Sequence, residues 1–227
     1  MTVKENLQSI QASIQEACQR VGRNAKDVQI IAVTKYVSVE TANEAILAGV
    51  KHLGENRVEG GLEKWEALHD KANWHFIGSL QSRKVKDMIG KFEYIHSLER
   101  LSLAKEIDKR AKSGQTVKCF VQVNISEEQS KSGLSVEEVI PFIHELAKYE
   151  SIQVIGLMTM APFVEDAEET RPIFRRLKQL QEEIRALNLK HAPCTELSMG
   201  MSNDYIVAIE EGATYIRLGT SLVGKEF

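Results

Sequence analysis

The sequence predicts a single (β/α)8 TIM barrel, an α/β fold in which each of eight parallel strands is followed by a helix. Short, almost continuously apolar and β-branched runs alternate with longer segments of helical periodicity, and eight such runs occur in the 227 residues. They are Val28–Thr34, Val50–Leu53, Trp74–Gly78, Tyr94–Leu98, Val117–Ile125, Ile152–Met158, Thr195–Ser198 and Thr214–Leu218. A doubly wound open sheet is the alternative, but the G-x-G-x-x-G loop that usually accompanies it does not follow the first run.

Helix signals lie at both ends of this pattern. Apolar residues recur at intervals of three and four from Leu7 to Val21, which predicts an extra N-terminal helix. Gly22 follows, at the position where a left-handed residue ends many helices. Near the other end, Ser202 is a candidate N-cap for a helix that ends at Gly212.

The composition is that of a globular protein without a strongly basic surface. The chain is 43% hydrophobic and carries 29 Lys and Arg against 32 Asp and Glu, a net charge of −3. Nucleic acid is therefore not an expected partner, because phosphate-backbone binding depends on concentrated positive charge. No apolar run approaches the roughly 18–20 residues that span a membrane, and the polar start lacks a secretion signal.

The cysteines favour a reducing compartment. The chain has three cysteines, Cys18, Cys119 and Cys194. They lie far apart in the sequence and suit neither a disulfide framework nor a C-x-x-C metal site. No linker or change of composition divides the chain. We therefore expect one cytoplasmic domain over residues 1–227, and a monomer, because no assembly domain accompanies the barrel.

Lys35 is the first candidate for chemistry, because functional residues in such barrels lie at the carboxyl ends of the strands. It follows the first apolar run directly and is expected to project its amine into the barrel mouth, where a neutral amine can condense with an aldehyde. The alternative is a lysine whose ammonium group reaches solvent from a strand end.

The two segments that follow the last two strands form the second candidate. Ser198–Asp204 and Arg217–Ser221 are rich in small and hydroxyl residues, which allow backbone N–H groups to approach an anion. Phosphate sites in these barrels often use the loops after strands seven and eight. The alternative is helix capping by Ser202 and a tight turn at Gly219.

Arg217 requires an acceptor if it lies where its strand leaves the core. A buried guanidinium cannot lose its charge by deprotonation and must be hydrogen-bonded. The acceptor is either a carboxylate such as Glu196 or an atom of a ligand.

Two M-x-M units, Met158-x-Met160 and Met199-x-Met201, are a weaker signal. Residues two apart on a strand face the same side, so these thioethers are expected either to fill the barrel or to line a wall beside a flat ring. His75 lies among apolar residues and is expected to be a hydrogen-bonded core histidine. No grouping of His, Cys, Asp and Glu has metal-ligand spacing, so no metal site is expected.

In several segments the chain resembles the pyridoxal phosphate homeostasis proteins (the YggS/PROSC group), which are related to the N-terminal barrel of alanine racemase. The matching segments are Ile31–Lys35, Gly54–Val58, Trp74–Gln81, Val121–Ile125, Lys131-x-Gly133, Gly156–Ala161, Leu197–Asp204 and Arg217–Thr220. One departure is Arg83-Lys84, where the family often has Asn-Lys.

The resemblance implies pyridoxal 5′-phosphate (PLP) as the cofactor, held as an internal aldimine on Lys35. It implies that Ser198, Gly219 and Thr220 bind the phosphate and that Arg217 faces the pyridine nitrogen. Asn56 and Met199 are also expected at the cofactor. An arginine there disfavours protonation of the ring nitrogen, so the ring is expected to be a weak electron sink.

The resemblance therefore implies a non-catalytic protein that holds PLP reversibly and supplies PLP-dependent apo-enzymes. Lys131, in a polar loop, is a candidate second amine for transfer. The alternative is a PLP-dependent amino-acid racemase, which needs a base on each face of the substrate; Tyr36 is expected to point away from Lys35 if the strand continues. A Schiff-base aldolase acting on a phosphorylated sugar is a third reading, and its resting form would be colourless.

Overall fold

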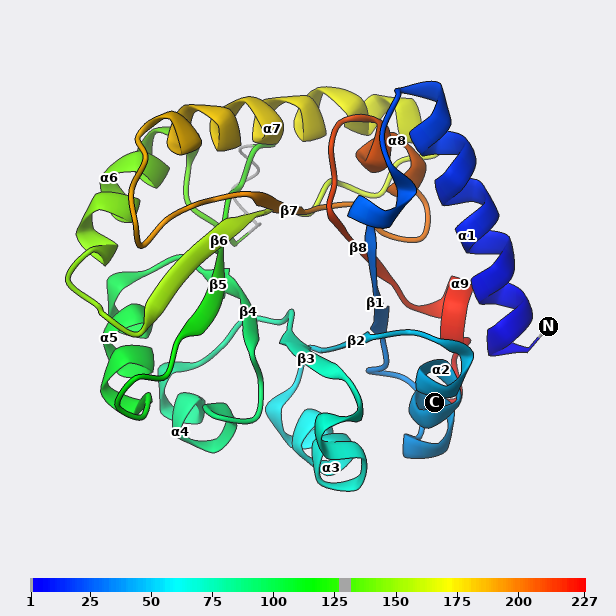
Figure 1. Ribbon diagram of the computed structural model, residues 1–227, viewed down its shortest axis with the longest axis horizontal. Helices are drawn as coiled ribbons and strands as arrows, with labels where there is room; N and C mark the ends of the chain where they lie inside the picture. The colour runs from blue at the N-terminus through cyan, green and yellow to red at the C-terminus, as the bar shows by residue number, and fades with distance from the viewer. Residues whose placement is uncertain (1, 127–131) are drawn as a thin grey trace.

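The computed structural model describes residues 2–126 and 132–227, and in this part of the chain eight parallel strands close into one barrel in sequence order (Figure 1). The strands are β1 Gln29–Val33, β2 His52–Glu55, β3 Asn73–Phe76, β4 Tyr94–Leu98, β5 Val117–Gln122, β6 Ile152–Met158, β7 Glu196–Ser198 and β8 Tyr215–Leu218. Each predicted run overlaps one strand, so the predicted barrel is confirmed. The barrel closes where β8 pairs with β1 and places Arg217 opposite Ile31.

Helices surround the ring of strands (Figure 1). They are α1 Val3–Arg20, α2 Val39–Ala48, α3 Val58–Leu68, α4 Val85–Met88, α5 Leu101–Arg110, α6 Val136–Leu146, α7 Arg171–Ala186, α8 Tyr205–Glu210 and α9 Thr220–Val223. Short 3-10 turns, η1 Ala25–Asp27, η2 His69–Lys71, η3 Ser82–Lys84 and η4 Ala167–Thr170, complete the connections. The extra N-terminal helix is confirmed: α1 contacts α2, α8 and α9 on the outside of the barrel, and it ends before Gly22, which has a φ of 68°.

The core has two layers because side chains on each strand alternate between the barrel interior and the helices. On β3, for example, Trp74 and Phe76 pack in the outer layer, whereas His75 between them faces inward. The apolar part of the inner layer is a separate cluster of six buried residues, Ile31, Tyr94, Phe120, Ile155, Met158 and Tyr215. The inner layer therefore leaves room for polar side chains among aromatic rings.

The loop between β7 and α8 differs from the sequence prediction. Helix α8 begins after Asp204, not after Ser202. The Ser202 hydroxyl instead hydrogen-bonds the hydroxyl of Ser221, 2.8 Å away, and the Asp204 carboxylate accepts a 2.6 Å hydrogen bond from the Met201 N–H. The predicted capping role of Ser202 is therefore wrong, because this serine joins the loop to the start of α9.

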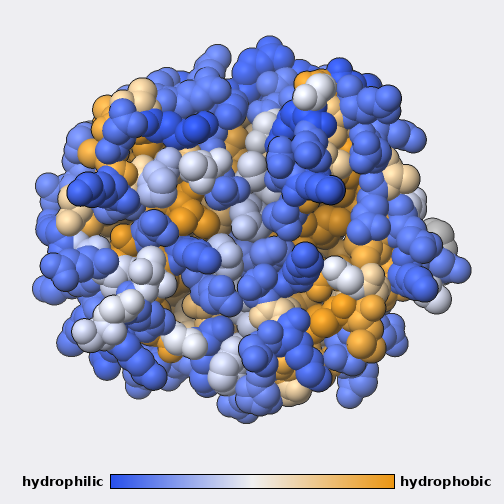
Figure 2. Space-filling view, viewed as in Figure 1, coloured by the Kyte–Doolittle hydropathy of each residue, from blue (hydrophilic) through white to orange (hydrophobic). Residues whose placement is uncertain are grey.

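The surface in Figure 2 is mostly hydrophilic, with smaller hydrophobic areas between the hydrophilic residues. Among the described residues, no helix has the length and hydropathy required to cross a bilayer. The three cysteines are buried and unpaired. Burial raises the thiol pKa of both Cys119 and Cys194 to about 12, so neither is a reactive thiolate at neutral pH.

Candidate functional site

A cavity of about 520 Å³ opens at the carboxyl ends of the strands, and we call it the carboxyl-end cavity. Its walls come from residues at or beyond the carboxyl ends of β1, β2, β3, β5, β6, β7 and β8. Its volume lies within the ~300–1,000 Å³ range typical of small-molecule sites. Five of the seven predicted cofactor-binding residues line it, and these are Lys35, Asn56, Arg217, Gly219 and Thr220.

Lys35 reaches this cavity because β1 ends at Val33 and the chain turns there. Its amine lies 4.8 Å from the centre of the Tyr36 ring, and both side chains line the cavity. The expectation that Tyr36 points away from Lys35 is therefore wrong. Strand alternation does not apply to this pair, because both residues lie in the turn beyond the strand end.

Arg217 lines the cavity, and its guanidinium donates hydrogen bonds to two acceptors. Its Nη1 group donates to the Ser198 hydroxyl at 2.6 Å, and its Nη2 group donates to the Thr159 carbonyl at 2.9 Å. Burial lowers the pKa of Arg217 to about 10 and the Asp204 carboxylate opposes that change, so the guanidinium is charged at neutral pH. Glu196, the predicted carboxylate partner, instead accepts a hydrogen bond from Thr195.

The other two predicted residues, Ser198 and Met199, are fully buried and do not line the cavity. The Ser198 hydroxyl contacts Arg217 and the Nδ1 atom of His96, 2.9 Å away. Met199 packs in the outer core layer. The structure therefore places both residues beneath the cavity.

The two loops after β7 and β8 do meet at the cavity, as the sequence predicted. The Ser202–Ser221 hydrogen bond joins them, and residues 201–204 and 219–220 contribute adjacent parts of the wall. Gly200, with a φ of 92°, allows the tight path of the first loop.

The M-x-M units are each divided between core and cavity. Met158 and Met199 are buried, whereas Met160 and Met201 are 39% and 36% exposed and line the cavity. The expectation that both members of a unit face the same side is wrong, because β6 ends at Met158 and β7 ends at Ser198.

Sequence reasoning missed the structural role of Gly78. A Cβ atom on Gly78 would lie 2.3 Å from the carbonyl oxygen of Asn56, so only glycine allows the two segments to approach this closely. The glycine at the end of the apolar run Trp74–Gly78 was the available signal. Its close contact holds Asn56 at the cavity wall.

Three buried histidines, His52, His75 and His96, form a hydrogen-bonded line that the sequence did not predict. The prediction that His75 is a hydrogen-bonded core residue is confirmed. Nδ1 of His52 lies 2.9 Å from Nε2 of His75, and Nδ1 of His75 lies 2.8 Å from Nε2 of His96. Burial, the largest cause, lowers the pKa of His52 to about 4 and the pKa of His75 and His96 well below the usual value. All three are therefore neutral at pH 7.

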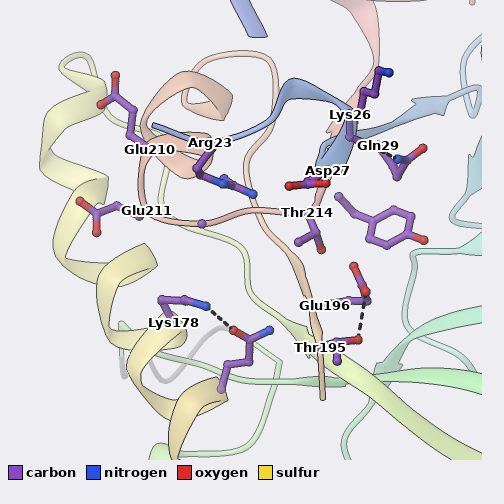
Figure 3. A pocket seen from close by; sticks show the side chains of 13 residues that line it. Arg23, Lys26, Asp27, Gln29, Lys178, Thr195, Glu196, Glu210, Glu211 and Thr214 are labelled. Atoms are coloured by element: carbon purple, nitrogen blue, oxygen red, sulfur yellow. Dashed lines mark hydrogen bonds between the residues drawn. The ribbon is translucent and has the colours of Figure 1, made fainter. Parts of the chain in front are cut away.

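A second cavity, of about 740 Å³, lies at the opposite end of the barrel, near the starts of β1, β7 and β8 (Figure 3). Its acidic residues Glu210 and Glu211 form ion pairs with Arg171 at 2.6 and 3.0 Å, and Lys178 donates to Gln181. The negative charges of Glu210 and Glu211 are thus balanced by arginine partners. Among the described residues, no cluster of His, Cys, Asp and Glu could hold a metal ion.

Comparisons with known proteins identify the family and the fold. The family model for the alanine racemase N-terminal domain matches residues 6–226. A pyridoxal phosphate homeostasis protein of Aquifex aeolicus is 41% identical over 227 residues, covering 99% of each chain. The structure of PipY from Synechococcus elongatus with PLP bound has a TM-score of 0.84 and 32% identity, covering 98% of this chain and 100% of that one.

An alanine racemase of Clostridium difficile shares the fold, with a TM-score of 0.76 and 20% identity, but the match covers only 56% of the racemase chain. The barrel therefore corresponds to part of that enzyme, whereas it corresponds to the whole of the homeostasis proteins. On the family model and on identity over nearly its full length, the chain belongs to the pyridoxal phosphate homeostasis protein family, within the alanine racemase N-terminal domain group.

Proposed function

We propose that this protein binds PLP in the carboxyl-end cavity and serves PLP homeostasis as a reversible carrier. The observation that carries the proposal is the arrangement in one cavity of Lys35, the Arg217 guanidinium and the Gly219–Thr220 segment. The names of its relatives support it, since the Aquifex aeolicus protein is a pyridoxal phosphate homeostasis protein and PipY was solved with PLP bound.

The cavity suits the three chemical parts of PLP. Lys35 supplies an amine for the aldehyde: condensation forms a C=N bond between the lysine nitrogen and the aldehyde carbon and releases one water molecule. Gly219 and Thr220 supply small residues at the start of α9 for the phosphate. Met160 and Met201 provide partly exposed thioethers for the ring, and Asn56 a polar wall.

Arg217 supports a carrier role over a strongly catalytic one. PLP, when bound, supplies an electron sink whose strength depends on protonation of the ring nitrogen. Arg217 holds a positive charge in a buried position and does not transfer a proton to another group at neutral pH. Beside the ring nitrogen, this charge disfavours protonation and keeps the sink weak.

Reversibility of the Lys35 bond allows transfer to PLP-dependent apo-enzymes. Hydrolysis, or exchange with a second amine, releases the cofactor and restores the free lysine. Lys131, the candidate second amine, lies outside the described residues.

A racemase remains the second candidate function because Tyr36 lines the cavity beside Lys35. A tyrosine hydroxyl and a lysine amine are groups that can carry protons to and from a substrate carbon. Incubation with L-alanine measures this activity directly. Sustained formation of D-alanine that is lost in Tyr36→Phe would establish the racemase and contradict the carrier proposal.

Absorption spectra and reductive trapping test the carrier proposal. The protein with added PLP is expected to be yellow, to bleach with borohydride, and to give a mass adduct on the peptide that contains Lys35. Lys35→Ala should remove the colour and the adduct. Lys225→Ala is the matched control, because its amine lies 5.3 Å from the same Tyr36 ring. An adduct on Lys225, or none in the wild type, would overturn the proposal.

A further inference from the structure

The three buried histidines connect the amino end of the barrel to the carboxyl-end cavity. His52, His75 and His96 lie on the neighbouring strands β2, β3 and β4, and consecutive rings are joined by the 2.9 and 2.8 Å contacts given above. His96 then reaches across the interior to Ser198 on β7, 2.9 Å away. Ser198 in turn accepts from Arg217 in the cavity floor.

Arg217 fixes the role of the Ser198 oxygen in this line. A guanidinium only donates, so the Ser198 oxygen accepts from Nη1, and the Ser198 proton gains an acceptor when it points to Nδ1 of His96. Nδ1 of His96 is therefore unprotonated, and a neutral His96 carries its proton on Nε2.

The tautomer of His96 sets the tautomers of His75 and His52. Nε2–H of His96 donates to Nδ1 of His75, which places the His75 proton on its own Nε2. Nε2–H of His75 then donates to Nδ1 of His52. All three rings are thus Nε2–H tautomers. A charged ring at His75 or His96 would place a donor against a donor, and burial, which lowers the pKa of each histidine, opposes that charge.

The reverse direction satisfies fewer groups. If His96 carried its proton on Nδ1, Ser198 would accept from both His96 and Arg217, and its hydroxyl proton would lose the acceptor that His96 provides. A buried hydroxyl without an acceptor destabilises the folded protein, so this direction is disfavoured.

Aromatic packing fixes the ring planes that this line requires. His75 stacks on Tyr94 with ring centroids 4.0 Å apart and an interplanar angle of 6°. His96 stacks on Phe120 at 4.2 Å, and His52 meets the Tyr215 ring edge-on at 5.5 Å. The histidines are therefore oriented by the inner core layer, independently of the cavity.

We propose that His96 is a positioning residue for Arg217. By accepting the Ser198 proton, His96 leaves the Ser198 oxygen to accept from Arg217 and holds the guanidinium against the cavity floor. His75 and His52 hold His96 in the tautomer that this arrangement needs. The inference deepens the proposed function, on which it rests for the identity of the cofactor that Arg217 faces.

Its consequence for the site concerns Ser198. The Ser198 proton is committed to His96 and is not available to a phosphate in the cavity. The serine, which is fully buried at the end of β7, acts on the cofactor only through Arg217.

Imidazole nitrogen NMR of the cofactor-free protein tests this line without reference to PLP. At neutral pH the spectrum should show His52, His75 and His96 as neutral Nε2–H tautomers, assigned by single substitutions. Exposed His144 on α6 serves as the internal reference for an imidazole in water. An Nδ1–H or a cationic ring at any of the three positions would overturn the inference.

Two variants test the positioning role. His75→Phe keeps an aromatic ring against Tyr94 but removes the hydrogen bonds of His75 to His52 and His96. It should produce an Nδ1–H population at His96 and shift the NMR signals of the Arg217 side-chain N–H groups. Ser198→Ala should shift the Arg217 signals directly, and serves if His75→Phe does not fold. Tyr94→Phe, beside His75 but outside the line, is the matched control and should change neither signal.

Unchanged Arg217 signals in a folded His75→Phe or Ser198→Ala variant would contradict the positioning role. Adding PLP separates this inference from the proposed function. If the wild type shows the three tautomers but forms no coloured complex, the carrier proposal fails and the line of histidines stands. If the complex forms, its absorption maximum should shift in both variants and stay in place in Tyr94→Phe.

Discussion

The hydroxyl of Thr34 donates a 2.6 Å hydrogen bond to the carboxylate of Glu55, immediately before Lys35 in the chain. The same carboxylate oxygen lies 3.1 Å from the amine of Lys64 on α3. Thr34, Glu55 and Lys64 are 0%, 1% and 6% exposed, so the cluster is shielded from water. It ties the end of β1 to β2 and α3 at the point where the chain turns to bring Lys35 into the cavity.

Lys64→Met is expected to destabilise the protein strongly. Removing one partner of a buried ion pair leaves an uncompensated charge and costs about 3–5 kcal/mol, which urea unfolding measures. The double variant Glu55→Gln with Lys64→Met should recover part of the loss, because no unpaired charge remains. The charged pair Lys84 and Glu59 is the exposed control, and Lys84→Met should change stability by less than about 1 kcal/mol. Equal losses in the two lysine variants would contradict this account.

Gly78→Ala should damage the fold and the site together. The added Cβ would meet the Asn56 carbonyl oxygen at 2.3 Å, a contact with backbone that no rotamer change can relieve. We expect a loss of roughly 1–3 kcal/mol in unfolding free energy and weaker PLP binding, because Asn56 must move. Gly60→Ala is the control, since nothing lies within 4 Å of a Cβ at that position of α3. A Gly78→Ala protein as stable as Gly60→Ala would show that the two segments separate freely.

The buried histidines should make stability fall in mildly acidic solution. The pKa of His52 is about 4 in the folded protein, against about 6.5 in an unfolded chain, and the pKa values of His75 and His96 are also lowered by burial. Between these values the unfolded state binds more protons, so stability is complete above about pH 6.5 and decreases as the pH falls toward the folded pKa.

Each such histidine contributes a slope of about 1.4 kcal/mol per pH unit within this window. Urea unfolding between about pH 7 and about pH 5 measures the sum before most carboxylates titrate near ~4. The slope should be smaller in His75→Phe and unchanged in His144→Gln, where the histidine is exposed. A flat profile in the wild type would show that the three rings are solvated.

The sequence predicted the barrel because buried parallel strands produce continuous apolar, β-branched runs, and each of these runs overlaps a strand. It also predicted that Lys35, Arg217 and Gly219 would meet, because the carboxyl ends of barrel strands converge on one face. The carboxyl ends of the strands converge in every barrel of this type, so identifying the strands was enough to predict which residues meet.

The predictions of side-chain orientation were wrong for residues just beyond the ends of strands. Tyr36, Met160 and Met201 were placed by alternation, which holds only inside a strand, and no residue type marks the end of β1, β6 or β7. The contact of His96 with Ser198 joins residues 102 apart in sequence, and no local pattern encodes it. Burial of single histidines was predictable, whereas their alignment depends on strand register around the closed barrel.

Phe163 should control cofactor release without contributing to stability. It is 83% exposed in the loop after β6, yet it lines the carboxyl-end cavity. Phe163→Ala is expected to change the unfolding free energy by less than about 0.5 kcal/mol, because little apolar area is buried there. If the ring covers bound PLP, its loss should speed transfer to an apo-enzyme about tenfold, equivalent to ~1.4 kcal/mol.

Leu47→Ala is the matched control for this prediction. Leu47 is 79% exposed on α2 and does not line the cavity, so its truncation removes a comparable apolar side chain from the surface alone. Stopped-flow absorbance in the presence of an excess of apo-enzyme measures release in both variants. Identical release rates in Phe163→Ala and Leu47→Ala would show that the exposed ring leaves the bound cofactor uncovered. A faster rate confined to Phe163→Ala would place the loop after β6 on the route by which PLP leaves.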